Sequence, residues 1–590
     1  MRFSGFVGPS YVSQSINAAA QRCVNWYVEQ IEVGDEPSQA VLYPTPGCAT
    51  FSTLATTPIA GMAAIRTGGV DRCFAVSNDT LYEILPDGSS ESRGRVEIES
   101  GLPATFSANV DAGDEVFITS GGRGYIFTLS TNVLTQVMIG SDVAPITVHQ
   151  GEFLDGFFLG LDRDTSTLYL SELHDGAATW DATQYAQRTA GSDPWQSLIV
   201  ANRDIWLFGK NSSEVWYNAG TAPFPFAAIP GAFIEEGIAA PASAARFGNT
   251  VMWLGQSEEG SCVVWKANGY TPQRVSTHAV EHAIQTYIRN GRTVSDAVAM
   301  SYQESGHIFY VLGFPSADAT WVYDGATGLW HERGTWDADE RRYCAWRPQS
   351  HAFAFNKHLV GDYQTGVVYE MGLDKFTDAG GGPIRRLRRT PHLNVDDRTL
   401  FYHKFQLMLE TGEGLPMPSS PSFPVTSSEP VFTDNGITTE EGYGCIFTMP
   451  AGVPCPYFVG NWVKISNGVG GFAKLNGMFQ VTAVNGAKTQ FSYVLLVSAP
   501  ATSTTADLGI TAQKFFPDLD PQIMVRWSDD GAHTWGHEHW VSAGKIGEYS
   551  ARAIWRRLGR GRNRVFEVSV TDPVPWRLTF ATLDVSEGTS

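Results

Sequence analysis

The stretch "DIWLFGKNSSEVWYNAG" (residues 204–220) contains two apolar-aromatic runs separated by a short polar segment. Runs rich in Ile, Val, Trp, Tyr and Phe favour β-strands, and the Asn-Ser-Ser segment between them favours a turn. The stretch therefore predicts two antiparallel strands joined as a hairpin.

The same hairpin pattern occurs seven times between residues 70 and 380. The second runs are centred on Tyr82, Ile126, Tyr169, Trp216, Val264, Val322 and Val368, which lie 44, 43, 47, 48, 58 and 46 residues apart. The first runs include "CFAV" at 73, "IWLFG" at 205 and "AFAF" at 352. A hairpin that recurs about every 45 residues is typical of a four-stranded propeller blade. The spacing predicts a β-propeller of six to eight blades, about seven, because a sandwich lacks this longer period and a solenoid usually has a shorter one.

Composition supports a mainly β protein of several units. The chain has 590 residues, of which 43% are hydrophobic, 12% aromatic and 17% charged, with 60 Gly and 31 Pro. This balance suits many short strands separated by turns. The formal charge of −20 argues against nonspecific nucleic-acid binding by the whole surface, because phosphate contacts need a positive field.

Changes in pattern divide the chain. We expect N-terminal strands or an arm over residues 1–55 and the propeller over 56–382. The Pro-rich spacer "GLPMPSSPSFPVTSSEPV" (414–431) opens an inserted small β domain over 414–515. Residues 383–413 and 516–590 alternate apolar and polar side chains and predict a C-terminal β-sandwich or barrel.

Arginines are concentrated in two short windows of this predicted sandwich. Guanidinium groups so close together repel one another unless they face anions, such as phosphates or the carboxylates of a partner subunit. The alternative is a solvated basic strand edge that blocks aggregation. The candidate partner contacts are Arg385, Arg386, Arg388, Arg389, Arg552, Arg556, Arg557, Arg560, Arg562 and Arg564.

The segment "WSDDGAHTW" (527–535) nearly matches the Asp-box of sialidases and related glycosidases. Ser528, Asp530, Thr534 and Trp535 fit the pattern, but Ala532 stands where glycine is usual. The box is a hairpin turn that lies away from the sugar site, so we expect a structural role. A retaining glycosidase would also need two carboxylates roughly 5 Å apart, and the sequence identifies no such pair.

Other motifs for chemistry or export are missing from the sequence. It has no P-loop, no G-x-S-x-G and no H-E-x-x-H motif, so we expect no catalysis, cofactor or metal. The seven cysteines contain no C-x-x-C pair and are expected to be reduced, buried thiols in a protein made in the cytoplasm. No signal peptide or apolar run of about 18 residues is present, so we expect no membrane anchor.

Several segments, in a shared order, resemble the packaged-DNA stabilisation proteins of short-tailed (podovirus) bacteriophages. They are "RCVNWYVEQIE" (22–32), "LYPTPG" (42–47), "DIWLFGKNSSEVWYNAG" (204–220), "EEGIAAPASAARFGNTVMWLG" (235–255), "VWKANGYTPQRVSTHAVEHA" (264–283) and "VRWSDDGAHTWGHEHW" (525–540). The resemblance covers most of the chain except residues 414–515.

The resemblance implies a tail hub or adaptor subunit of the virion, synthesised in the host cytoplasm. Such a protein assembles below the portal ring, closes the DNA channel to retain the packaged genome, and docks fibres, spikes or a needle. It implies a homo-oligomer, as a hexameric ring, with DNA passing through the channel without sequence-specific binding. The alternatives are a tail-associated propeller that binds or depolymerises glycans and a cellular propeller scaffold.

Overall fold

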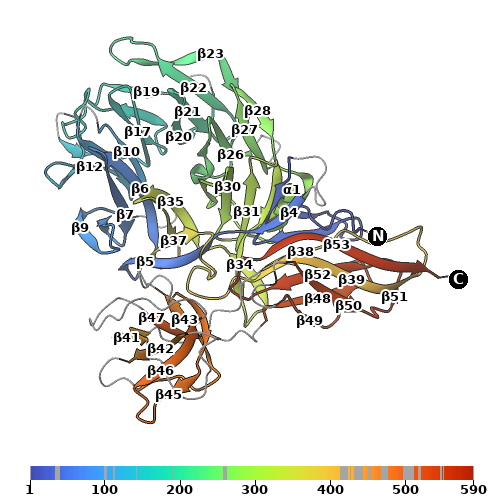
Figure 1. The fold of residues 1–590 in the computed structure, drawn as a ribbon. Coiled ribbons are helices and arrows are strands. Elements are labelled where there is room, and N and C mark those ends of the chain that lie inside the picture. The colour runs from blue at the N-terminus through green and yellow to red at the C-terminus, as the bar shows by residue number, and fades with distance from the viewer. Residues whose placement is uncertain are drawn as a thin grey trace.

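Figure 1 shows the fold of the chain in a computed structural model. The described residues are 2–32, 40–98, 103–110, 113–140, 143–188, 191–256, 262–411, 423–424, 427–430, 443–449, 454–466, 476–495, 511–515, 520–544, 548 and 550–588. Among these residues, no helix is long and apolar enough to cross a bilayer.

Seven antiparallel blades form a ring, which confirms the predicted propeller (Figure 1). Blade 1 contains β6 (Ile59–Thr67), β7 (Val70–Ser77), β8 (Thr80–Ile84) and β9 (Ser90–Arg95). Blade 2 contains β10 (Thr105–Ala108), β11 (Glu115–Ser120), β12 (Arg123–Thr128) and β13 (Val133–Gln136), and the small hairpin β14 (Met138–Ile139) and β15 (Ala144–Pro145) follows it. Blade 3 contains β16 (Gln150–Leu154), β17 (Phe157–Asp162), β18 (Thr167–Leu170) and β19 (Tyr185–Gln187).

Four further blades complete the ring. Blade 4 contains β20 (Trp195–Ala201), β21 (Asp204–Gly209), β22 (Ser213–Asn218) and β23 (Phe226–Ile234). Blade 5 contains β24 (Gly237–Ile238), the 3-10 turn η1 (Pro241–Ser243), β25 (Ala245–Phe247), β26 (Thr250–Gln256), β27 (Cys262–Asn268) and β28 (Thr271–Arg274). Blade 6 contains β29 (Val298–Glu304), β30 (His307–Phe314), β31 (Ala319–Asp324) and β32 (Leu329–Glu332). After the hairpin β33 (Gly334–Asp337) and β34 (Arg342–Ala345), blade 7 contains β35 (Pro348–Ala354), β36 (Lys357–Asp362) and β37 (Gly366–Gly372).

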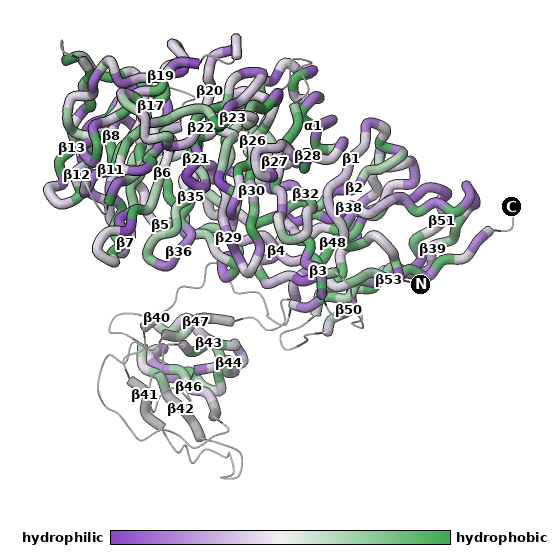
Figure 2. The backbone as a smooth tube through the Cα atoms, turned by 90° about the horizontal axis from the view of Figure 1, so that it is seen from above, coloured by the Kyte–Doolittle hydropathy of each residue, from purple (hydrophilic) through white to green (hydrophobic). Residues whose placement is uncertain are grey.

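The hairpin at 204–220 is the β21–β22 pair of blade 4. Ile205 lies opposite Trp216 in this pair, and Phe208 lies opposite Ser213. Side chains on both faces of β21 are buried because a blade packs between its two neighbours. Figure 2 shows hydrophobic residues along such strands and hydrophilic residues in many of their connections.

Blade 7 departs from the predicted repeat. The run "AFAF" at 352 lies in β35, not in the strand that precedes β37. The second strand of this blade is β36, whose sequence "KHLVGD" contains only two apolar residues. Its buried Asp362 accepts hydrogen bonds from Tyr369 and Thr365 instead. The buried polar side chain of this strand has hydrogen-bond partners within the blade, so the strand lacks the apolar run that the repeat predicts.

The N-terminal region closes the ring. Strand β5 (Gly47–Ala55) pairs antiparallel with β37 as the outermost strand of blade 7. The innermost strands of blades 7 and 1, β35 and β6, are in contact. One blade thus contains strands from both ends of the propeller sequence, which joins the two ends without a covalent bond.

The C-terminal β-sandwich is built around two sheets. One contains β2 (Ala20–Val24), β38 (Arg386–Arg389), β52 (Val565–Val570), β48 (Gln522–Ser528) and β49 (His539–Ser542), with β1 (Tyr11–Val12) paired to β2. The other contains β3 (Trp26–Gln30), β4 (Ala40–Pro44), β53 (Arg577–Glu587), β39 (Leu400–Glu410), β50 (Ala551–Arg556) and β51 (Arg560–Gly561). Between them, Phe405 and Phe566 stack with ring centroids 4.6 Å apart. N-terminal strands therefore complete the sandwich whose other strands come from the C-terminal part of the chain.

The sandwich and the propeller share one sheet. Strand β32 of blade 6 pairs in parallel with β2 through Val24 and Glu332. Arg22 and Ser10 hydrogen-bond the Glu332 carboxylate at this seam. The strands of blade 6 and the first sandwich sheet therefore form one ten-stranded sheet, which runs from the propeller axis to the edge of the sandwich.

Helix α1 (His278–Arg289) connects blade 5 to blade 6. The Oγ1 atom of Thr277 accepts a hydrogen bond from the Val280 amide and caps its first turn. Ala279, Val280 and Ile284 are buried on one face of the helix. This spacing is that of an amphipathic helix that covers the propeller side.

The insertion contains two small sheets. One contains β40 (Phe423–Pro424), β47 (Thr511–Phe515), β43 (Trp462–Ser466) and β44 (Gly477–Gln480), and the other contains β41 (Ser427–Pro430), β42 (Tyr443–Thr448), β46 (Gln490–Leu495) and β45 (Ala483–Val484). Phe447, Val463, Phe491 and Tyr493 are buried in its core. Apart from 423–424 and 427–430, the spacer predicted at 414–431 lies outside the described residues.

A buried histidine also links propeller and sandwich. His307 of blade 6 contacts Asp324 through Nδ1 at 2.9 Å and Glu29 of β3 through Nε2 at 2.5 Å. The hydrogen bond to Asp324, together with that to Glu29, raises the pKa of His307 to about 9 despite desolvation. The imidazolium form therefore bridges two carboxylates from different parts of the fold.

We expect His307→Gln to destabilise the chain most at low pH. The folded pKa lies above the unfolded value of about 6.5, so this stabilisation is complete below pH 6.5 and is lost as pH rises through about 9. The melting temperature of the unmodified chain should exceed that of the variant at pH 6 by more than at pH 9.5. A constant difference between these pH values, measured by calorimetry, would contradict the charged bridge.

Candidate functional site

The two arginine windows meet in the sandwich. Strand β38, from the first window, pairs antiparallel with β52, which follows the second. Strand β50 of the second window lies in the opposite sheet and pairs with β39. The ten candidate arginines divide into a buried or ion-paired set and an exposed set.

Arg388 is fully buried and forms an internal hub of hydrogen bonds. Its guanidinium donates to the backbone carbonyls of residues 5, 6, 9 and 22 and to the Gln21 side chain, at 2.5–3.2 Å. Burial lowers the pKa of Arg388 to about 10, so the group is still charged at neutral pH. This side chain fixes the N-terminal segment onto the sandwich.

Arg564 has the same role at the end of the sandwich. It forms an ion pair with Asp529 at 2.6 Å and lies over the Tyr402 ring at 4.1 Å. It also donates to the carbonyls of Leu558 at 2.7 Å and Arg560 at 3.3 Å. The buried guanidinium thereby holds the turn that connects β50 to β51.

Three more arginines contact groups of their own chain. Arg385 forms an ion pair with Glu538 at 2.8 Å, and Arg389 forms one with Glu567 at 2.7 Å. Arg386 is buried, with its guanidinium 5.9 Å from the Trp26 ring, and desolvation lowers its pKa to about 10.

Sequence reasoning missed that these side chains face inward. Alternation along β38 places Arg386 and Arg388 on one face of the sheet, and this face is covered by N-terminal strands. The internal acceptors are largely backbone carbonyls, which no side-chain motif records. The predicted contact of arginines with a partner therefore stays a proposal, and it applies only to the exposed arginines.

Most of the exposed set lies at one end of the sandwich, around the turn between β50 and β51. Among the described residues, these arginines have no ion-pair partner. The backbone at Arg557 has a φ of 59°, which turns the chain between β50 and β51. The members of the set are Arg552, Arg556, Arg557, Arg560 and Arg562. The last four lie around the β50–β51 turn, and we call this surface the basic end, whereas Arg552 lies opposite Met408 near the other end of β39.

The Asp-box-like segment forms a closed turn. The Asp530 carboxylate accepts hydrogen bonds from the Ser528 and Thr534 hydroxyls at 2.6 Å and from the Thr534 amide. These bonds hold the pKa of Asp530 well below its usual range. Trp535 lies under the guanidinium groups of Arg389 and Arg526, 4.6 and 5.1 Å from its ring centroid. The segment thus packs into the sandwich.

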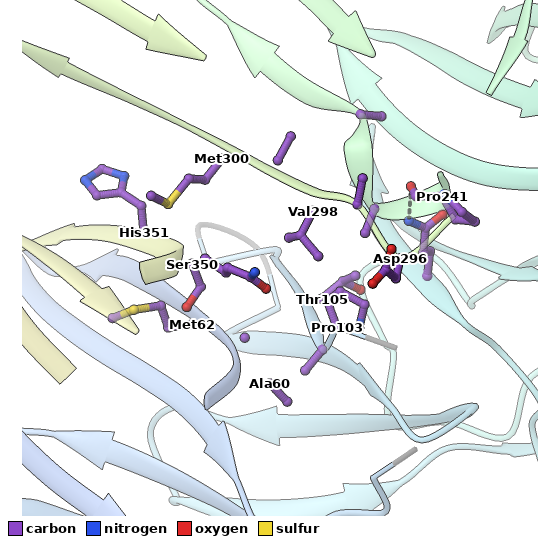
Figure 3. A pocket seen from close by; sticks show the side chains of 18 of the residues that line it. Ala60, Met62, Pro103, Thr105, Pro241, Asp296, Val298, Met300, Ser350 and His351 are labelled. Atoms are coloured by element: carbon purple, nitrogen blue, oxygen red, sulfur yellow. Dashed lines mark hydrogen bonds between the residues drawn. The ribbon is translucent and has the colours of Figure 1, made fainter. Parts of the chain in front are cut away.

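A cavity of about 390 Å³ lies at the propeller axis (Figure 3). Its walls come from several blades and include Met62, Thr105, Pro241, Met300 and His351. Burial lowers the pKa of His351 to about 4, so this imidazole is neutral at pH 7. Asp296 is the one carboxylate among the described lining residues, whereas retaining glycoside hydrolysis needs a pair.

Histidine and carboxylate side chains, which are common metal ligands, occur together at several places in the described part of the chain. Glu538 of the "HEH" segment is paired with Arg385, and His539 stacks on Trp527 at 4.7 Å. His149, Asp162 and Asp164 lie within 4.8 Å of one another. Asp162 accepts hydrogen bonds from the Thr165 hydroxyl and the Asp164 amide, as in an ordinary hairpin turn.

Two known sequence families match the chain in order. Residues 10–375 match the family described as "Bacteriophage P22 Gp10, beta-propeller", and residues 499–586 match "Bacteriophage P22 Gp10, beta-sandwich". The first match alone covers more than half of the chain. Residues 376–498, with most of the insertion, lie between the two matches. No curated protein is a significant match.

Solved structures of low similarity also match parts of the chain. The N-terminal domain of Nup159 is 10% identical, with 59% of this chain and 98% of that chain covered and a TM-score of 0.33. The extracellular domain of the two-component system BT4673 from B. thetaiotaomicron is 8% identical, with 68% and 46% covered and a TM-score of 0.36. YCF48 bound to D1 peptide is 12% identical, with 58% and 97% covered and a TM-score of 0.34. Likenesses at these TM-scores are too weak to support a statement about fold or function.

We expect Arg388→Ala to lower the unfolding free energy by roughly 3 kcal/mol, because several buried acceptors lose their donor at once. Urea unfolding followed by tryptophan fluorescence measures this loss. The matched control is Arg552→Ala, an exposed arginine whose removal should change stability by no more than about 0.5 kcal/mol. Equal stabilities of the two variants would show that the buried network is dispensable.

Proposed function

The chain belongs to the bacteriophage P22 Gp10 family of packaged-DNA stabilisation proteins, and from this premise we propose that it is the hub or adaptor subunit below the portal ring. A protein of this family is a structural component of the phage tail and is part of the virion. The match to both the propeller and the sandwich, in order along the chain, carries the proposal.

In the proposed role, the subunit closes the DNA channel after packaging and offers docking sites for fibres, spikes or a needle. The continuous sheet between blade 6 and the sandwich supports this role, because a rigid body can transmit position between partners. We propose a hexameric ring as the assembled form. The formal charge of −20 suits DNA that passes without sequence-specific binding, since like charges repel within a Debye length of about 8–10 Å.

We propose that the subunit acts without catalysis. The axial cavity supplies one carboxylate among its described lining residues, and the Asp530 carboxylate of the Asp-box-like turn is occupied by hydrogen bonds within that turn. A glycan-cleavage screen with purified protein should therefore release no sugar. Release of oligosaccharides would support the depolymerase alternative instead.

We expect the purified protein to add a ring of density to portal rings of its own phage in electron microscopy. The variant Arg556→Glu/Arg557→Glu should add no ring while its circular dichroism is unchanged, because the basic end then repels acidic partners. Arg292→Glu, an exposed arginine after α1, serves as the control and should still assemble. Failure of the unmodified chain to add a ring would refute the hub role.

A further inference from the structure

Charge is distributed unevenly between the two parts of the molecule. The propeller, residues 56–382, contains 38 Asp and Glu against 20 Lys and Arg. Residues 551–564, which include the basic end, contain six Arg and no Asp or Glu. One copy of the chain therefore carries a strongly acidic body and a concentrated basic end.

The basic end is held in a fixed shape. Buried Arg564 donates to the carbonyls of Leu558 in the β50–β51 turn and of Arg560 at the start of β51, and the Leu558 amide donates to the Tyr402 carbonyl at 3.0 Å. Phe401 pairs with Arg560 across the strands and is 40% exposed. A preorganised surface with charge and an exposed ring loses little entropy when it binds.

An acidic surface of matching character lies on blade 3. The connection between β18 and β19 exposes Glu172, Asp175 and Asp181, and these carboxylates have no ion-pair partner within the described chain. Residues 164–187 contain no Lys or Arg. Leu173 and Tyr185 beside them are 55% and 46% exposed. We call this surface the acidic edge.

The acidic edge is also rigid. Glu115 of blade 2 accepts hydrogen bonds from the Gly176 and Ala177 amides at 2.8 and 3.2 Å. Trp180 is fully buried and its indole donates to the Gly176 carbonyl at 3.0 Å. The connection therefore presents its carboxylates from a fixed position.

The two surfaces cannot meet within one molecule. Blade 3 lies across the ring from blade 6, which is fused to the sandwich. Figures 1 and 2 both place β17 and β19 at the opposite end of the molecule from β51. A contact between the two surfaces must therefore join two copies.

We propose that the basic end of one copy docks on the acidic edge of blade 3 of a second copy of this chain. The contact uses two different surfaces, so each copy can bind one neighbour at each end, and a suitable rotation closes the set into a ring. A protein occupant is favoured over DNA because both surfaces combine charges with exposed apolar side chains, and because the acidic propeller would repel a duplex. The inference rests on the proposed hub role and names the contact by which copies assemble.

A charge-swap experiment tests the contact. The first variant is Arg556→Glu/Arg557→Glu, and the second is Glu172→Lys/Asp175→Lys. Analytical ultracentrifugation should show that the self-association constant of each variant alone is at least roughly tenfold lower than that of the unmodified chain. Like charges then face each other across the contact. An equimolar mixture should recover association, because alternating copies pair opposite charges at every contact.

The control Asp87→Lys/Asp339→Lys changes net charge as the second variant does, on exposed residues away from blade 3, and should associate normally.

Several outcomes would overturn the contact. Normal association of the blade 3 variant, no recovery in the mixture, or no association of the unmodified chain would each do so. If the arginine variant instead loses binding to a DNA duplex in fluorescence anisotropy while association is unchanged, the basic end binds nucleic acid and the inference is wrong. These results leave the hub role intact as long as the unmodified chain adds a ring to portal rings, and failure of that separate assay refutes the hub role itself.

Discussion

The pairing of β32 with β2 is the constraint on which the rest of the structure depends. It continues blade 6 into the sandwich, so the outer edge of that blade is covered by strands from the N-terminal and C-terminal parts of the chain. An uncovered edge would expose unpaired backbone groups. The Val24–Glu332 pair, the Asn25 and Ser10 amides that donate to β32 carbonyls, and the side-chain bonds to Glu332 fix the sandwich against the propeller, so the basic end and the acidic edge are held at opposite sides.

Buried arginines reinforce this arrangement at a desolvation cost. For Arg388, hydrogen bonds to backbone carbonyls of the N-terminal segment offset this cost. For Arg564, the ion pair with Asp529 and hydrogen bonds to the carbonyls of a turn offset it. A buried guanidinium left without such partners would destabilise the fold by several kcal/mol, on the order of 3–5 kcal/mol. These side chains therefore tie separate segments together, and the turn that Arg564 holds is the one that carries exposed arginines.

The period of the apolar-aromatic clusters was enough to predict the propeller, because most residues of the second and third strands of most blades are buried and apolar. The apolar pattern did not predict strand β36, because polar residues of this strand have partners in the folded chain. Asp362 accepts a hydrogen bond from Tyr369, and His358 contacts His351 of β35. The division of the arginines could not be predicted for the same reason, because most acceptors of Arg388 are backbone carbonyls from residues hundreds of positions away and Arg385 and Arg389 pair with carboxylates more than 150 positions away. The Asp-box-like turn was readable in sequence, as its hydrogen bonds are local.

Closure of blade 7 by β5 has a consequence for biosynthesis. The ribosome releases β5 early, yet its partner β37 emerges more than 300 residues later, and β4 waits for β53 near the other terminus. The ring cannot close before residue 372 has left the ribosome, and the sandwich cannot be completed before β53 has, so β5 and one edge of β4 remain unpaired for much of translation. Such long-range pairing is slow and leaves strand edges open to aggregation, so a nascent chain of this topology depends on late, concerted collapse or on chaperone protection.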